Sequence, residues 1–203
     1  MSVDPKVFTQ IDQLKRILAD VPKGTPKALA GAMNRSMLSA RTVASKETRA
    51  RYNVKASDIK AATRIQKANY STMQATLVFS EKARSLMKFD PSSKSPTQYP
   101  TIVSVKVKKK RSSVKGGFIA SGPKGGTTMF KREGKTRLPI AKLHGPSIPQ
   151  MVGNESVVDK MGEKLLSTLE TRLDHEVDRL LAGHYSGETK NLRNDKARWG
   201  KIQ

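Results

Sequence analysis

Hydrophobic residues recur at helical intervals in three segments of the chain. Residues 5–20 and 26–52 each carry apolar positions three and four residues apart, which predicts two helices, the second of them long. A third helix is expected to begin at Asn154 as its N-cap and to end at Gly183. Its apolar positions recur at every fourth residue: Val157, Met161, Leu165, Leu169, Leu173, Val177 and Leu181.

The region between the second and third helices alternates apolar and polar residues, which is typical of strands. After a short helix over 57–60, we expect strands at 64–68, 73–79, 102–108, 118–120 and 127–131, with 86–89 continuing the sheet. The Gly-rich link at 122–126 reads as a hairpin turn, because it lacks the ending of a phosphate loop. The order helix, helix, strands, helix predicts an α+β fold with long N- and C-terminal helices packed on a mostly antiparallel β-sheet.

This pattern predicts a single domain over residues 1–183. Residues 184–203 have a weak apolar pattern, so we expect a C-terminal tail that is ordered only by contact with a partner. The first residues lack the apolar core of a signal peptide, and we expect no membrane span.

The strong positive charge of the chain is the property that most directly suggests a function. The chain has 39 Lys and Arg against 17 Asp and Glu, for a net charge of +22. Between Asp90 and Glu133 there is no acidic residue. A flexible loop after the strand at 102–108 is expected to project positive charge, and the candidate residues for contact with DNA or another polyanion are Lys106, Lys108, Lys109, Lys110, Arg111 and Lys115.

Three interpretations of this basic cluster stay open: a solvated hairpin tip, a surface that contacts phosphates, and a surface that contacts an acidic neighbouring protein. Phosphate contact is electrostatic and needs no fixed spacing, whereas recognition of single strands needs aromatic residues, which are missing nearby. The sequence therefore favours non-specific contact with double-stranded DNA over specific recognition.

The sequence offers few parts for catalysis or metal binding. There is no cysteine, and His144, His175 and His184 lack the four-residue spacing of a helical metal pair. Glu133 is the only acidic residue from Pro91 to Asn154, so a nuclease centre near the basic cluster is not expected. We predict no catalytic residue, no metal and no cofactor.

An irregular, Pro-rich span at residues 137–151 follows the predicted strands and is too apolar to be a loop exposed to solvent. Its apolar side chains must be covered, either by the parent domain or by an adjacent subunit, and we favour the subunit. The predicted interface residues are Arg137, Leu138, Pro139, Ile140, Gly145, Pro146, Ile148, Pro149, Gln150 and Met151.

Two parts of the sequence carry a recognisable pattern. One comprises residues 132–140 and 143–151, including the distinctive Gly-Pro-Ser-x-Pro-Gln block, and the other comprises residues 28–35 and 51–59. Both resemble the phage minor tail protein Z family, whose members are tail-completion proteins of long-tailed phages and prophages, and the similarity extends over about 7–182. The resemblance implies a non-enzymatic virion component at the head-proximal end or neck of the tail, which passes through the host cytoplasm during assembly.

The resemblance also implies partners. The expected ones are further copies of the chain in a ring (a hexamer, to match a tail tube), the tail terminator, tube or head–tail connector, and double-stranded DNA. The basic loop, or the basic face of helix 26–52, is then expected to line the channel. The alternatives are a general nucleic-acid-binding protein of nucleoid or ribosome type, and a tail chaperone absent from finished virions.

Overall fold

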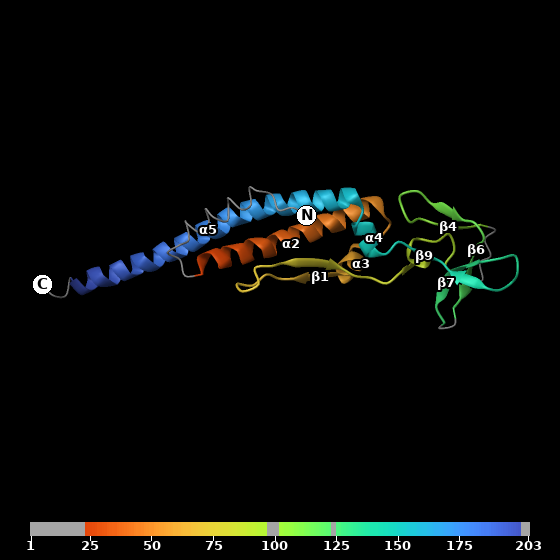
Figure 1. Cartoon of the computed structure of the whole chain (residues 1–203), viewed down its shortest axis with the longest axis horizontal. Helices are drawn as coiled ribbons and strands as arrows, with labels where there is room; N and C mark the ends of the chain where they lie inside the picture. Colours follow the sequence, from red (N-terminus) through yellow and green to blue (C-terminus); the bar gives the residue numbers. More distant parts are fainter. Residues whose placement is uncertain (1–22, 97–101, 123–124, 200–203) are drawn as a thin grey trace. The chain divides into compact units, whose positions relative to one another are not determined.

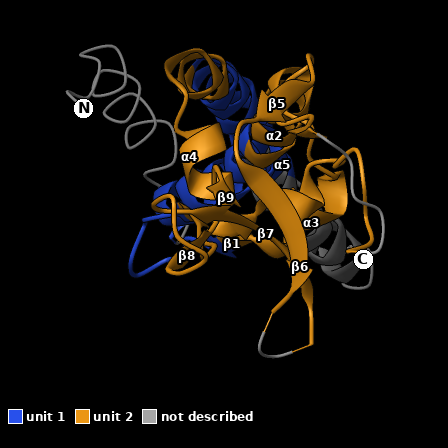
Figure 2. Cartoon of the chain, turned by 90° about the vertical axis from the view of Figure 1, so that its right-hand side faces the viewer, with its two compact units in different colours: residues 1–40, 65–76, 163–203 blue, residues 41–64, 77–162 orange. Residues whose placement is uncertain are grey.

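The computed structural model describes residues 23–96, 102–122 and 125–199. The predicted helix at 5–20 lies outside these residues. The chain divides into two compact units, coloured in Figure 2: unit 1 comprises residues 1–40, 65–76 and 163–203, and unit 2 comprises residues 41–64 and 77–162. The two long helices, α2 (Gly24–Arg51) and α5 (Glu155–Trp199), contribute to both units.

Unit 1 has a small helical core. Ala28 and Ala32 of α2 pack against Leu173 of α5, and all three are buried. The small alanines allow the helices to approach closely, and Figure 1 shows α5 lying along α2. In the same unit, the Asn34 side chain bonds the backbone of Ala68 twice, accepting from its N–H at 2.8 Å and donating to its C=O at 3.0 Å.

The end of α5 corrects one sequence prediction. The helix does not end at Gly183 but continues to Trp199. A glycine inside a helix costs only about 1 kcal/mol relative to alanine, and the residues after it include good helix formers such as Glu, Lys, Leu and Arg. Periodicity alone could not show this, because the apolar pattern weakens beyond Leu181.

Unit 2 contains the larger core and most of the strands. Its buried residues are Ala44, Ile59, Leu86, Phe89, Val103, Val105, Ile119, Met129, Ile148, Met151, Val152 and Val157. The elements are α3 (Ala56–Ala61), β3 (Arg84–Ser85), η1 (Leu86–Lys88), β4 (Val103–Val105), β5 (Ser112–Val114), β6 (Gly117–Ser121), β7 (Thr127–Arg132), β8 (Ile140–Lys142), β9 (His144–Gly145) and α4 (Ile148–Val152). Strands β1 (Thr63–Gln66) and β2 (Thr76–Phe79) form a pair of their own.

The strands of unit 2 form small antiparallel sheets. β6, β7 and β8 make a three-stranded meander, while β3 pairs with β9 and β4 pairs with β5. β6 and β7 pair as an antiparallel hairpin, as predicted, and the N–H of Gly122 donates to the carbonyl of Gly126 at 2.8 Å, while residues 123–124 of the predicted turn lie outside the described residues. The predicted α+β class is confirmed, with long helices and small antiparallel sheets.

Three strand predictions are wrong in detail. In the segment 86–89, Leu86–Lys88 form the 3₁₀ turn η1 and the Phe89 side chain that follows is fully buried, so the apolar character of the segment reflects a core contact rather than a strand. The strand predicted at 102–108 is only β4, because the chain turns into a hairpin after Val105. β7 is followed by two further short strands, β8 and β9.

A buried arginine joins several elements of unit 2. The Arg84 side chain is only 2% exposed and pairs with Asp58 of α3 and with Glu81, whose Oε1 lies 2.6 Å from Nη1. The other Glu81 oxygen accepts the backbone N–H of Ile148 at 2.9 Å. This ionic network therefore holds the start of α4 in place.

Candidate nucleic-acid interface

The basic loop 106–111 connects β4 to β5 and is fastened to the rest of unit 2. The backbone N–H of Asn53 donates to the carbonyl of Val107 at 2.9 Å, and the N–H of Lys106 donates to the carbonyl of Phe89 at 2.8 Å. Tyr52 also forms an isolated β-bridge with Lys108. The expectation that this loop projects well beyond the folded body is therefore wrong. Its backbone lies against the C-terminal end of α2 and the turn after it.

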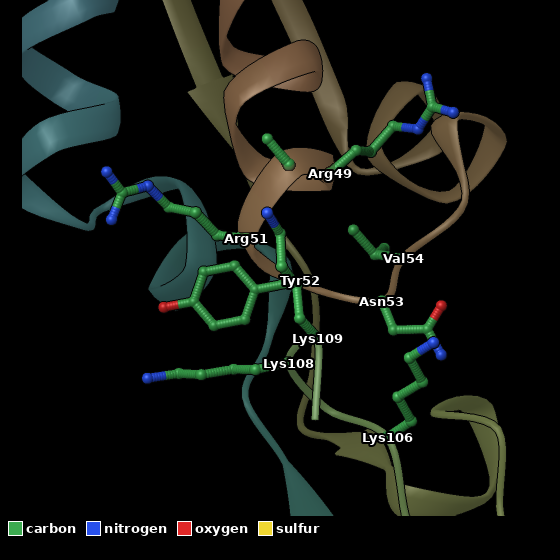
Figure 3. A pocket seen from close by; sticks show the side chains of 9 residues that line it. Arg49, Arg51, Tyr52, Asn53, Val54, Lys106, Lys108 and Lys109 are labelled. Carbon is green, nitrogen blue, oxygen red and sulfur yellow. The ribbon is translucent and has the colours of Figure 1, made fainter. Parts of the chain in front are cut away.

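This fastening brings cations from two distant parts of the sequence together around a hollow of about 330 Å³. We call it the loop hollow, and it is lined by Arg49, Ala50, Arg51, Tyr52, Asn53, Val54, Lys106, Lys108 and Lys109. Five of these residues are cationic, all five are exposed, and none of the described lining residues is acidic. Figure 3 shows Arg51, Tyr52 and Lys108 extending to the same side, with Arg49 and Lys106 directed toward the other.

An adjoining hollow of about 630 Å³ extends this surface. It shares Ala50, Arg51, Tyr52, Lys108 and Lys109 with the loop hollow and adds Glu47, Lys110, Asn154 and Lys160. Glu47 accepts a hydrogen bond from Lys160 at 2.8 Å, and this bond lowers the pKa of the Glu47 carboxyl. The ionised carboxylate therefore offsets Lys160 first, and its charge also interacts with Lys46 and Arg51.

The six cations predicted from the sequence do not act as one group. Lys106, Lys108 and Lys109 line the loop hollow, and Lys110 lines the adjoining one. Arg111 is instead bound to Asp90, with 2.6 Å between Nη2 and Oδ2 and 2.9 Å between Nη1 and the backbone carbonyl. Lys115 is exposed in the turn between β5 and β6 and lines neither hollow.

The sequence does not indicate that the loop lysines lie beside Arg49 and Arg51. The basic face of helix 26–52, which includes both arginines, and the basic loop are alternative predictions for the surface that lines the channel. The bridge between Tyr52 and Lys108 joins them into one surface. No sequence pattern indicates that Tyr52 and Lys160 belong to this surface, because a single tyrosine and a lysine on a helix are common in any sequence.

The predicted interface residues separate into buried and exposed groups. Ile148 and Met151 are fully buried in the core of their own unit, so their apolar character does not require a subunit contact, and that prediction is corrected for them. Gly145 packs so closely on Phe89 that an added Cβ would lie 2.5 Å from its ring. By contrast, Leu138 is 66% and Ile140 is 37% exposed.

The remaining predicted interface residues lie around these two groups. Arg137 and Pro139 are exposed beside Leu138, while Pro146 and Pro149 are half-buried near α4. Gln150 is exposed, but its Oε1 accepts the backbone N–H of Ser147 at 2.9 Å and so caps α4.

Neither a metal centre nor a membrane span emerges from the described residues. Over residues 23–96, 102–122 and 125–199, no three His, Cys, Asp or Glu side chains gather as metal ligands would. The helices within the same ranges are too polar or too short to span a bilayer.

A family model described as prophage minor tail protein Z (GPZ) matches residues 9–183. The chain belongs to this family. The resemblance found in residues 132–151 and 28–59 is thereby confirmed, and the chain is assigned to the structural proteins of phage tails. No curated protein and no solved structure matches it. The match includes both parts of the candidate surface, the end of α2 and the loop 106–111.

Proposed function

We propose that this minor tail protein completes the head-proximal end of the tail and helps join it to the head. In this proposal several copies form a ring, and the loop hollow of each copy faces the double-stranded DNA that passes through. The observation that carries the proposal is the convergence of five exposed cations from α2 and the loop 106–111 around a hollow whose described lining has no acid.

The chemistry of the hollow suits a duplex backbone. Five like charges at close range repel one another, and a polyanion removes this cost. Lys and Arg contacts to phosphate need no base edge, so the surface tolerates any sequence that moves past it. One aromatic ring, Tyr52, lies among the lining residues, which gives no platform for successive stacked bases.

In this proposal the copies contact one another through the segment between β7 and β8 together with Ile140, the first residue of β8. We call residues 133–140 the arm. It carries Leu138 and Ile140 exposed beside Lys135 and Arg137, so its apolar surface is uncovered within its own described chain. The remaining partners are the tail terminator, the tube or the head–tail connector. The role is mechanical and electrostatic, without catalysis or a cofactor.

Salt dependence of DNA binding tests the electrostatic part. If five cations contact phosphates, the slope of log K against log salt is about −4.5, which is about a 500-fold loss of affinity between about 50 and 200 mM salt. The quadruple variant Arg51→Gln, Lys106→Gln, Lys108→Gln and Lys109→Gln is expected to reduce the slope by about 3.6. Fluorescence anisotropy of a short labelled duplex measures both values.

A control removes the same charge elsewhere. Lys55, Lys67, Lys82 and Lys88 are all exposed and line neither hollow, and their change to Gln leaves the slope near that of the unchanged chain. In phage particles, the hollow variant is expected to assemble tails but to impair DNA delivery. Normal infectivity of the hollow variant, or equal slopes for variant and control, would reject the DNA contact.

A further inference from the structure

We infer that a second hollow, on a different face of α2, binds phosphate groups of the same DNA. The inference rests on the proposed function, because it extends the proposed DNA surface. We call it the α3 hollow. It has a volume of about 310 Å³ and is lined by Arg41, Thr42, Ser45, Lys46, Arg49, Ala56, Ile59 and Lys60.

The arrangement follows from helical geometry. Arg41, Ser45 and Arg49 lie four residues apart on α2, so they form a row on one face. Lys46 adjoins that row, and Lys60 is contributed by α3. Four cations from two helices therefore surround one depression.

One acidic residue near the hollow, Glu47, interacts electrostatically with Lys46, but its carboxylate is hydrogen-bonded to Lys160. None of the four cations takes part in a described ion pair, and none of the described lining residues is acidic. Lys46, Arg49 and Lys60 are exposed, and Arg41 is half-buried. The mutual repulsion of such a group is relieved when an anion occupies the depression.

The floor of the hollow adds a neutral donor. Two apolar residues, Ala56 and the buried Ile59, also line the hollow and offer no group that competes for an anion. Ser45 is half-buried on the same wall. Hydroxyl groups beside Lys and Arg are common partners of phosphate oxygens.

Arg49 connects the two sites, because it lines both the α3 hollow and the loop hollow. Arg41 lies eight residues before Arg49, which is about 12 Å along a helix axis. A DNA duplex carries a charge about every 1.7 Å along its axis, so one rigid duplex can meet cations spread over this length. A continuous polyanion therefore fits the combined surface better than the isolated carboxylates of a folded protein partner.

The test uses the full chain and a short labelled duplex. The triple variant Arg41→Gln, Lys46→Gln and Lys60→Gln removes three cations that the loop hollow does not use. It is expected to reduce the salt slope by about 2.7. Adding Arg49→Gln reduces it by about 0.9 more. The triple control Lys55→Gln, Lys82→Gln and Lys88→Gln is expected to retain the slope, and equal thermal unfolding of both variants shows that the fold is kept.

The outcomes separate this inference from the proposed function. If the loop-hollow variant loses salt dependence while the triple variant retains it, the α3 hollow does not contact DNA and the inference is overturned. If the unchanged chain does not bind duplex DNA, both fail. If the triple variant binds duplex DNA normally but no longer binds polyglutamate, the hollow takes an acidic polypeptide, and the inference is likewise overturned.

Discussion

Residues 137–140 and 148–151 belong to one apolar span, yet they are covered in different ways. In the first segment, Leu138 is 66% exposed and Ile140 is 37% exposed. In the second, Ile148 and Met151 are fully buried in the core of unit 2. The apolar side chains of 148–151 therefore form part of the core, whereas those of 137–140 remain exposed to solvent.

The difference lies in how the backbone of each segment is anchored. Ile148 begins α4, and its N–H is held by Glu81, which also pairs with the buried Arg84. The helical turn then directs Met151 into the core. The arm is instead held by the N–H of Glu133, which donates to the carbonyl of Pro139 at 3.2 Å, and by the pairing of Ile140 with Arg132 at the end of β7. Anchoring to the core, rather than hydrophobicity, decides which residues are free for a partner.

The largest expected loss of unfolding free energy comes from Met151→Ala. Truncating a fully buried methionine costs about 2–5 kcal/mol, because it removes apolar contact and leaves a cavity. Urea denaturation of the purified chain measures the loss in unfolding free energy. Leu138→Ala is the matched control, since an exposed site is expected to change stability by less than about 0.5 kcal/mol. Similar stabilities for the two variants would erase the distinction between the segments.

A smaller effect is expected from Glu81→Gln. The change weakens the acceptor of the Ile148 N–H and removes a charge partner of Arg84, at a cost of about 1–3 kcal/mol. Glu133→Gln is the control, because Glu133 is exposed and its side chain has no ion pair among the described residues. Denaturation curves of the two variants give the comparison. If Glu81→Gln is as stable as the control, the network does not anchor α4.

Elements with a periodic apolar pattern can be predicted from this sequence, whereas features that depend on contacts between distant residues cannot. The stripe from Val157 to Val177 predicted a long helix, and the structure buries Val157 and Leu173 on it. The apolar run at 86–89 predicts a strand although Phe89 lies in the core after a 3₁₀ turn, because a short apolar run does not distinguish a strand from a core turn. For the site, charge identified the loop lysines, but their meeting with Arg49 depends on the bonds between residues 52–53 and 107–108.

Leu138→Ser is expected to change stability least, and it tests whether copies of the chain contact one another through the arm. Leu138→Ser removes an exposed side chain, so unfolding free energy is expected to stay within about 0.5 kcal/mol. If copies of the chain meet through the arm, burial of this leucine contributes about 1.5–3 kcal/mol to association. Its loss then weakens self-association about 10- to 100-fold, as measured by light scattering over a concentration series.

Leu166→Ser is the matched control for this test, because Leu166 is 45% exposed on α5 and the substitution is chemically identical. If both variants weaken association equally, general surface hydrophobicity accounts for it and the arm has no special role. If Leu138→Ser alone weakens it at unchanged stability, the exposed half of the span is the contact surface. Because Ile148 and Met151 face inward, their substitution cannot give this result without also lowering unfolding free energy, so the two measurements together assign each half of the span its role.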